Sequence, residues 1–482
     1  MRLLSMSLTA PDTEAVIDRT TIVSMPLASL GSLLTSWMER WFPDAFVFAI
    51  LITVAVFLAG LALGSPSSDL ANAFGEGFWG LVPFTMQMVM IILGGHVMAS
   101  SPPVSRLISW LAKIPATPRG AVTLVAFVAT STSLISYGFS LIFSGFLARQ
   151  IAQRPLQVDY RALGAAAYLG LGSVWALGLS SSAALLMATK SSMPPELLKI
   201  SGVIPLNQRI YTWQNIVTAL TLIVISVAVA GFSIPRGAAV RTGKSFGILA
   251  EPLSKPLEPP RTPGECLEYS PLLSVLIALL GFSYFFRVIA GSGLSAALNL
   301  NNYNFLFLML GLLLHWRPRS FTRAIADATP ATAGVLIQFP FYAGTFGMIT
   351  FSPISRMLAN GFAQISSHGN YPLLVSIYSA TLGFFVPSGG GKWLIEAPYV
   401  LAAAHTLKVS PGWIVQVYNT AEALPNLINP FWMLPLLGIL GLKARDLVGY
   451  GLLQLLVLAP VVLFLMWFLA RTFTYPPPGL PS

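Results

Sequence analysis

The chain has 482 residues, of which 55% are hydrophobic and only 9% are charged, with 27 Lys and Arg against 17 Asp and Glu. Because soluble globular domains carry about 25% charged residues, this composition excludes a water-soluble protein and predicts a polytopic membrane protein. The basic excess does not indicate nucleic-acid binding, since the basic residues lie between the apolar segments, as membrane topology requires.

The N-terminal segment, 1–43, precedes the first apolar span. It has no apolar run followed by a cleavage site, so we expect no signal peptide. Within it, Trp37, Arg40 and Trp41 end an amphipathic stretch, which predicts a helix that lies in the membrane interface.

Five windows of about 20 apolar residues are each long enough to cross a bilayer. They are residues 45–64, 81–100, 214–234, 272–290 and 447–470. Residues 236–270 hold several prolines among mixed charges, and we expect a cytoplasmic linker there. The chain is thus predicted to contain a first membrane repeat, 44–235, and a second repeat, 271–475, which has an extra leading span.

The two halves share a motif: PVSRL at 103–107 recurs as PISRM at 353–357, an offset of 250 residues. In each half the amphipathic helix that holds this motif is followed by a long apolar segment with a polar centre, at 121–148 and at 371–397. These segments are too long for one plain span, so we predict two re-entrant hairpins. The extra leading span places the hairpins on opposite sides of the membrane, as the inverted repeats of secondary transporters require.

The distribution of basic residues predicts the orientation. With the N-terminus in the cytoplasm, most Lys and Arg residues fall on the cytoplasmic side, which fits the positive-inside rule. The exception is segment 190–209, which places Lys190, Lys199 and Arg209 outside.

The first hairpin tip, 130–140, is dense in hydroxyl groups that can hydrogen bond to a carboxylate or to unpaired backbone. In membrane helices such groups also bond back to the helix's own carbonyls or help helices to pack. The hydroxyls are dense here, and a second polar segment lies 250 residues further along the chain, as the shared motif does. Both observations favour a binding role. The candidates are Ser131, Ser133, Ser136, Tyr137 and Ser140.

The second tip follows a proline, which stops a helix, and reads Ser388-Gly389-Gly390-Gly391-Lys392. If a half-helix begins at Gly391, its N-terminus points a positive dipole end at an anion. Lys392 adds a full charge at membrane depth, where charges are rare and usually functional. The alternative is that Lys392 pairs with Glu396, four residues further on, which leaves substrate contact open.

Two spans are interrupted by polar residues, the first at Ser180, Ser181 and Ser182 and the second at Asn426 and Asn429. Free carbonyls and amides at such breaks bind cations or the polar end of a substrate. A simple proline kink is the alternative at the second break. Secondary candidates for substrate binding are Gln87, Gln338, Tyr342, Glu396, Asn419 and Glu422.

The sequence holds no motif of a metal site or of a hydrolase. The four histidines and the single cysteine, Cys266, show no metal-ligand spacing, and neither H-E-x-x-H nor G-x-S-x-G occurs. We therefore expect no resident metal or cofactor, no intramolecular disulfide and no enzyme activity.

Several of these segments together resemble the bacterial short-chain fatty acid transporter family, the butyrate and acetoacetate uptake permeases. The resemblance begins at Trp41-Phe42-Pro43-Asp44, extends almost to the C-terminus, and includes 77–79, 86–88, 337–344, 386–391 and 429–432. It implies a scaffold domain and a mobile transport domain with two hairpins, as in elevator transporters. In the family pattern an Asn precedes each tip, whereas this chain has Ser136 and Gly383 at these places. The chain also has Glu396-Ala397-Pro398 where the family pattern has Gln-Gly-Pro.

We therefore predict a secondary transporter that moves short-chain fatty acids or similar small monocarboxylates across the bacterial cytoplasmic (inner) membrane, coupled to H⁺ or Na⁺. The carboxylate is expected between the two tips. The missing asparagines suggest that Lys392 acts as a built-in cation, which favours proton coupling or facilitated diffusion. The alternatives are a dicarboxylate or other organic anion permease and an anion channel. The expected partners are the carboxylate and the lipid bilayer, and a homodimer is expected only by analogy with related folds.

Overall fold

A computed structural model describes residues 40, 45–80, 82–235, 237–248, 259–297, 299–386, 388–429 and 431–475. Within these residues every regular element is helical. Six of the described helices are long and apolar enough to cross a membrane. The predicted all-α, polytopic membrane class is therefore confirmed. The expected interfacial segment, 1–43, lies outside the described residues except for Arg40.

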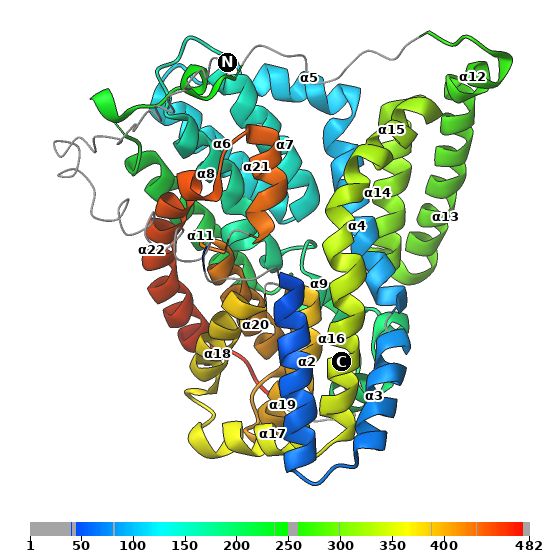
Figure 1. Ribbon diagram of the computed structural model, residues 1–482, viewed down its shortest axis with the longest axis vertical. Helices are drawn as coiled ribbons and strands as arrows, with labels where there is room; N and C mark the ends of the chain where they lie inside the picture. Colours follow the sequence, from blue (N-terminus) through cyan, green and yellow to red (C-terminus); the bar gives the residue numbers. More distant parts are fainter. Residues whose placement is uncertain are drawn as a thin grey trace, which may run out of the picture.

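The first half of the chain is a run of helices joined by short turns (Figure 1). Thr117 caps α6 by accepting a hydrogen bond from Gly120 N at 3.0 Å, and Pro118 opens the helix, where a missing N–H costs nothing. The helices of this half are α2 (Ala45–Ala62), α3 (Ser67–Gly80), α4 (Val82–Ser100), α5 (Pro102–Leu111), α6 (Pro118–Ser133), α7 (Tyr137–Ala152), α8 (Tyr160–Leu169), α9 (Ser182–Ala188), α10 (Pro195–Ser201) and α11 (Trp213–Phe232).

The first long helix of the second half, α13, is longer than the sequence predicts. Helix α13 continues beyond the predicted span, 272–290, and kinks at Gly293, whose φ of 78° suits glycine. The helices of this half are α12 (Pro263–Glu268), α13 (Pro271–Ala297), α14 (Leu300–His315), α15 (Pro318–Ala328), α16 (Ala333–Phe351), α17 (Ile354–Ile365), α18 (Tyr371–Phe385), α19 (Gly389–Thr406), α20 (Pro411–Asn426), α21 (Leu434–Leu440) and α22 (Ala444–Ala470).

Apolar length does not predict helix α3, which is polar and rich in glycine. It forms because it packs closely along α16. A Cβ atom on Gly77 would lie 2.6 Å from the carbonyl oxygen of Ala343, and one on Gly347 would overlap the carbonyl of Ala73. Small residues at such crossings let two membrane helices approach closely, and dispersion contacts then stabilise the pair.

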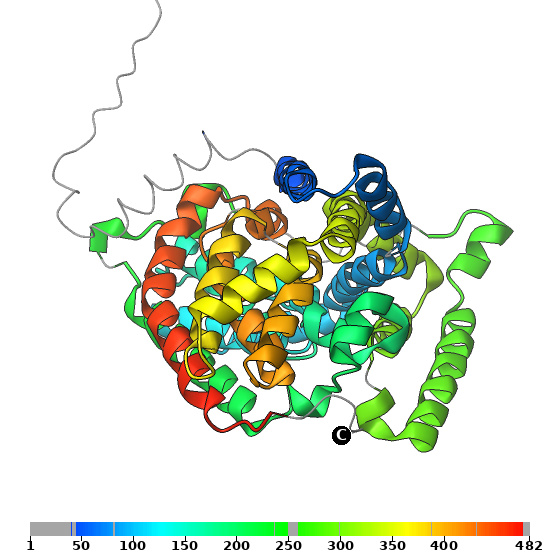
Figure 2. The same ribbon diagram turned by 90° about the horizontal axis from the view of Figure 1, so that it is seen from below.

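The helices pack as two groups that meet along one interface. One group contains α2, α3, α4, α13, α14, α15 and α16, and we call it the outer group. The other contains α6, α7, α8, α11, α18, α20 and α22, and we call it the core group. The outer group contacts the core side mainly where α4 packs on α7 and α16 packs on α19. Figure 2 shows the two groups side by side, with α13 at the outer edge.

The amphipathic helices and the helix pairs that correspond in the two halves lie at opposite ends of the molecule (Figure 1). Each half contains, in the same order, a long helix, a short amphipathic helix and a pair of helices joined by a tight turn. In Figure 1, α5 and the α6–α7 pair lie toward the top, whereas α17 and the α18–α19 pair lie toward the bottom. We call the two pairs the first hairpin (α6 and α7) and the second hairpin (α18 and α19).

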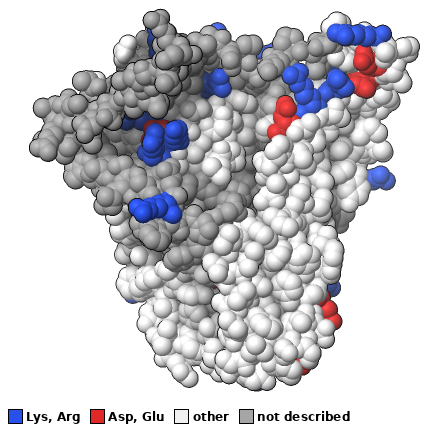
Figure 3. All heavy atoms as spheres, viewed as in Figure 1, with Lys and Arg blue, Asp and Glu red and all other residues white. Residues whose placement is uncertain are grey.

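The outer surface is suited to lipid. Large apolar side chains on three helices are each more than half exposed, namely Leu58, Leu220, Val224, Leu280 and Phe286. Lys and Arg side chains gather toward the top of the face in Figure 3, near α12 and α15, and much of its lower half carries no charge. An uncharged band below a basic end is the pattern that a bilayer with a positive inner side selects.

Candidate functional site: a cavity between two hairpins

The first hairpin turns at residues 134–136 and is held by its own hydroxyl groups. Ser136 caps α7 by accepting a hydrogen bond from Phe139 N at 3.2 Å. Ser133 donates to Thr130 O, and Ser140 donates to Ala129 O across the hairpin, at 2.9 and 2.7 Å. These hydroxyl protons stabilise the turn. Ser131, by contrast, lies half-buried on α6.

The second hairpin places a glycine-rich helix start deep in the protein. Helix α19 begins at Gly389, two residues before the predicted start at Gly391, and Ser388 caps it by accepting from Gly391 N at 3.2 Å. Both glycines are buried. A Cβ atom on Gly389 would overlap the Trp175 ring, and one on Gly391 would overlap Tyr342. The glycines therefore let the helix N-terminus reach the centre of the molecule.

The first interrupted span supplies the surface between the hairpins. Helix α8 runs into a π-helical turn, Gly170–Val174, and a 3₁₀ turn, Trp175–Leu177, and helix resumes at Ser182. The hydroxyl of Ser180 accepts a hydrogen bond from Tyr137 N at 2.6 Å. Ser181 caps α9 through Ala184 N at 3.1 Å. Ser180 thus fixes the break against the first hairpin, and Ser182 is left facing the space between the hairpins.

A small cavity lies where these parts meet. Its volume is about 20 Å³, which is room for about one water molecule. Both hairpins, both interrupted spans, α4 and α16 contribute to its wall, which is formed by Met88, Tyr137, Leu171, Trp175, Ser182, Val335, Phe339, Ser388, Gly389, Gly390 and Trp432. Four of the predicted binding positions at the tips, and one at the first break, therefore come together in three dimensions.

The cavity combines anion-binding backbone with an apolar wall. The N-termini of two full-length helices, α7 and α19, end at it through Tyr137 and Gly389. Helix N-termini carry partial positive charge, which favours a carboxylate. At α7 the N–H groups of Tyr137 and Phe139 are already bonded to Ser180 and Ser136. Trp175 lines the cavity, is 5% exposed, and its indole N–H has no hydrogen-bond partner among the described residues. Met88, Leu171 and Val335 offer surface for a short acyl chain.

Three aromatic members of the wall, Trp175, Phe339 and Trp432, are absent from the predicted set, whereas Tyr137 belongs to it. Trp175 and Phe339 carry no polar motif, and aromatic residues make up 11% of the chain. In a membrane protein such residues are most often lipid-facing or core residues, so their position in the sequence gives no signal of a binding role.

Lys392 follows Gly390 of the cavity wall by two residues on α19, and its ammonium is paired with carboxylates. Its Nζ atom lies 2.9 Å from Glu396 Oε1 on the same helix and 2.7 Å from Glu422 Oε2 on α20. It also donates to Ser379 O at 2.9 Å and lies 4.3 Å from the centre of the Tyr418 ring. We call Lys392, Glu396 and Glu422 the ion triad; all three side chains are at most 1% exposed.

A glycine makes room for the ion triad. Gly383 on α18 faces it, and a Cβ atom there would lie 2.8 Å from Glu422 Oε2 and 3.5 Å from Lys392 Cε. A larger side chain at 383 would displace the Glu422 carboxylate, so the glycine and the triad form one unit of packing.

The remaining predicted residues lie around the cavity, and several of them are engaged in structural contacts. Asn426 donates to Leu171 O at 3.4 Å, and Asn429 donates to Phe384 O at 3.0 Å. Asn419 donates to Gln416 at 2.8 Å. Helix α20 continues through Pro425 to Asn426, so the second break begins there. Outside the cavity wall also lie Gln87, which donates to Ser192 and Asn301, and the buried Gln338 and Tyr342.

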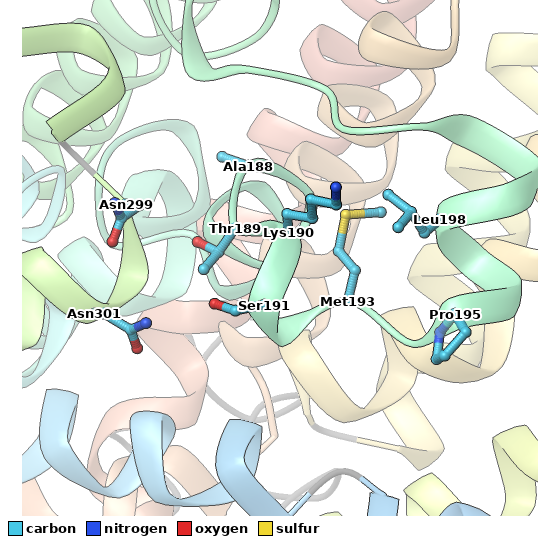
Figure 4. A pocket seen from close by; sticks show the side chains of 9 residues that line it. All are labelled: Ala188, Thr189, Lys190, Ser191, Met193, Pro195, Leu198, Asn299 and Asn301. Carbon is cyan, nitrogen blue, oxygen red and sulfur yellow. The ribbon is translucent and has the colours of Figure 1, made fainter. Parts of the chain in front are cut away.

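A wider pocket opens at the other end of α9 (Figure 4). Its volume is about 630 Å³, and its wall is formed by Ala188, Thr189, Lys190, Ser191, Met193, Pro195, Leu198, Asn299 and Asn301. Lys190 is exposed there. Since α9 begins at Ser182 in the central cavity and ends at Ala188 in this pocket, one short helix separates the two.

Comparison with known sequences finds one family over almost all of the chain. The family model described as "Short chain fatty acid transporter" matches residues 26–469. A relative from Escherichia coli K12 is 35% identical over 433 residues, which are 89% of this chain and 97% of that protein. A relative from Haemophilus influenzae is 33% identical over 449 residues, 92% of this chain and 100% of that protein. Both are named as short-chain fatty acid transporters.

Two solved transporters share the fold. The YdaH transporter of Alcanivorax borkumensis superposes with a TM-score of 0.58 at 16% identity, over 90% of this chain and 100% of that chain. MtrF of Neisseria gonorrhoeae, described as an antimetabolite efflux pump, gives a TM-score of 0.60 at 13% identity, over 94% and 100%. At these identities the likeness concerns the fold alone.

Proposed function

Because the chain belongs to the short-chain fatty acid transporter family, we propose that it moves short-chain fatty acids or similar small monocarboxylates across the bacterial inner membrane as a cation-coupled secondary transporter. The family is one of transporters, so the chain is a transporter and not an enzyme, as its motifs predict. The N-terminus is placed in the cytoplasm in this proposal.

The observation that carries the proposal is the cavity between the two hairpins. A carboxylate there would face the N-terminal backbone of α7 and α19 and the indole N–H of Trp175, while its short tail would lie against Met88 and Phe339. One anionic head and a small apolar body match this division of the wall.

The cavity favours a monocarboxylate over a dicarboxylate. A second carboxylate would need a second anion-binding group on the opposite wall, but that wall is formed largely by apolar and aromatic side chains. The nearby ammonium of Lys392 is already paired with two carboxylates. A dicarboxylate or another organic anion is therefore the second candidate.

The transport mode is part of the proposal. We expect the outer group to act as the scaffold and the core group, together with α19, to carry the substrate. The opposite placement of α5 and α17 supports an inverted repeat, whose halves exchange inward and outward roles (Figure 1). In the present conformation the cavity has room for about one water, so substrate binding requires the hairpins to separate. A closed cavity favours alternating access over a channel.

Helix α13, exposed at the outer edge, is the natural place for a dimer contact.

The test is transport of radiolabelled butyrate by the purified full-length protein in proteoliposomes. Protein-free liposomes correct for diffusion of the undissociated acid. We expect saturable uptake that acetate and propionate inhibit and succinate does not, together with exchange of external label for internal butyrate. Inhibition by succinate as strong as that by propionate would favour the dicarboxylate permease. Flux without exchange would favour a channel.

A further inference from the structure

We propose that Glu422 is the proton-binding group of this transporter and that the ion triad couples carboxylate transport to H⁺ rather than to a metal cation. The inference rests on the proposed function, because it names the coupling ion and the residue that carries it. The proton binds to a carboxylate oxygen of Glu422 from one side of the membrane and leaves to the other, and no bond of the substrate changes.

The charges of the triad do not balance. It holds one ammonium and two carboxylates in a place where all three side chains are at most 1% exposed. Fully ionised, it carries one uncompensated negative charge, which is costly away from water. A second positive charge is therefore needed, and it can be a proton or a bound cation.

The geometry favours the proton. Lys392 Nζ lies between the two carboxylates, at 2.9 and 2.7 Å, which is where a shared metal cation would have to bind. The described residues contain no cluster of three or more His, Cys, Asp or Glu side chains with the spacing of a metal site. A proton needs only one carboxylate oxygen.

The hydrogen bonds identify which carboxylate takes the proton. Both oxygens of Glu396 are used, because Oε1 accepts from Lys392 Nζ at 2.9 Å and Oε2 accepts from the Ser379 hydroxyl at 2.6 Å. Two such bonds stabilise the ionised form. In Glu422 only Oε2 contacts the ammonium, and Oε1 has no partner among the described residues. Glu422 is therefore the carboxylate that protonates at the lower cost.

The other titratable groups near the triad are phenols. Tyr371 and Tyr378 of α18 and Tyr399 of α19 surround Glu396, and Tyr418 of α20 lies over the ammonium. Phenols are uncharged at neutral pH, so they do not supply the missing positive charge. Among the described residues, no further acid or base forms an ion pair with the triad.

The proton and the substrate would favour each other's binding. Gly389 and Gly390 line the cavity on the same helix that carries Lys392, and the Tyr418 hydroxyl donates to Gly389 O at 2.6 Å. A net negative triad on the helix that lines the cavity repels an anion in the cavity, because the medium has a low dielectric constant. Protonation of Glu422 removes this repulsion. By linkage, a bound carboxylate then favours the protonated form to the same extent.

The experiment compares wild type, Glu422→Gln and the control Glu76→Gln, which changes an exposed carboxylate on α3. Each full-length protein in proteoliposomes is assayed for labelled butyrate exchange at equal pH and for uptake driven by an inward proton or sodium gradient, with protein-free liposomes subtracted. Gln mimics a protonated Glu. We expect Glu422→Gln to exchange butyrate but to lose proton-driven uptake by about tenfold or more, whereas Glu76→Gln behaves as wild type.

Uptake in Glu422→Gln that still rises with the proton gradient, or wild-type uptake driven by sodium alone, would overturn the inference and leave the proposed function intact. Wild type without any exchange or uptake would remove the proposed function itself. A second readout does not need transport: the infrared difference spectrum between acidic and neutral pH should contain a carboxylic-acid C=O band that Glu422→Gln lacks. If that variant does not fold, the band should shift in Glu422→Asp, and an unshifted band would contradict the assignment.

Discussion

Lys392 Nζ lies 2.7 Å from Glu422 Oε2, which joins the glycine-rich start of α19 to the last third of α20 inside the protein. The same nitrogen binds Glu396, so the pair predicted from helical spacing exists together with a second partner. The two carboxylates thus neutralise the lysine inside the protein. We therefore expect the two helix N-termini, rather than Lys392, to attract the substrate directly.

Replacement of Lys392 should destabilise the protein strongly. In Lys392→Ala, Glu396 and Glu422 remain buried without their cation, and the cost of breaking a buried ion pair in this way is about 3–5 kcal/mol. We expect a marked fall of the Tm in detergent and loss of uptake. Lys199→Ala, at an exposed ion pair with Glu196, is the control and should leave the Tm almost unchanged. An unaltered Tm for Lys392→Ala would contradict the burial of the triad.

Loss of the cap of α19 should weaken substrate binding. Ser388→Ala removes the acceptor for Gly391 N and disorders the helix start at the cavity, at a cost of about 1 kcal/mol. That corresponds to a KM for butyrate about fivefold higher. Ser410→Ala removes the equivalent cap of α20, whose hydroxyl accepts from Trp413 N outside the cavity wall. Equal KM values in the two variants would show that the cap acts on stability alone.

The indole N–H of Trp175 should contribute to affinity. Trp175→Phe keeps an aromatic ring in the wall but removes the donor, and a hydrogen bond to a charged group contributes about 1.5–3 kcal/mol. We expect KM to rise about tenfold or more with a small change in kcat. Trp393→Phe is a close control, since its indole N–H also has no partner among the described residues and Trp393 does not line the cavity. A rise of the same size in both variants would argue against substrate contact.

Lys190 should speed the arrival of the anion. It is exposed in the wider pocket at the far end of α9, where a positive charge raises the local concentration of carboxylate (Figure 4). In Lys190→Ala, kcat/KM should fall at low ionic strength and approach the wild-type value at high ionic strength, because salt screens such steering. Lys199→Ala should change neither value. A loss that is the same at all salt concentrations would indicate a structural effect instead.

Sequence periodicity predicts those parts of the fold that depend on local pattern. Apolar length and helix-breaking residues mark α4, α11 and α22, and the serine and glycine cluster at 388–391 marks the start of α19 to within two residues. Helix α3 is not predicted by periodicity, because its stability comes from close packing on α16, which is distant in the sequence.

The site is predictable only where its chemistry is local. The i,i+4 spacing predicts the contact of Lys392 with Glu396, but no spacing relates Lys392 to Glu422, which reaches it from another helix. Gly383 leaves room for the Glu422 carboxylate because it has no side chain, and only the packing of the folded protein shows this. Trp175 enters the cavity wall because α8 ends in irregular turns, and these turns are set by contacts with the first hairpin.

Binding of the substrate between the hairpins is tested most directly by butyrate exchange in proteoliposomes with the variants Gly389→Ala and Gly438→Ala. A methyl group at 389 would occupy the cavity against Trp175, whereas one at 438 meets no atom within 4 Å. We expect that Gly389→Ala, folded as judged by gel filtration, loses exchange and that Gly438→Ala keeps it. Exchange by Gly389→Ala with the wild-type rate and KM would show that the substrate does not bind between the hairpins.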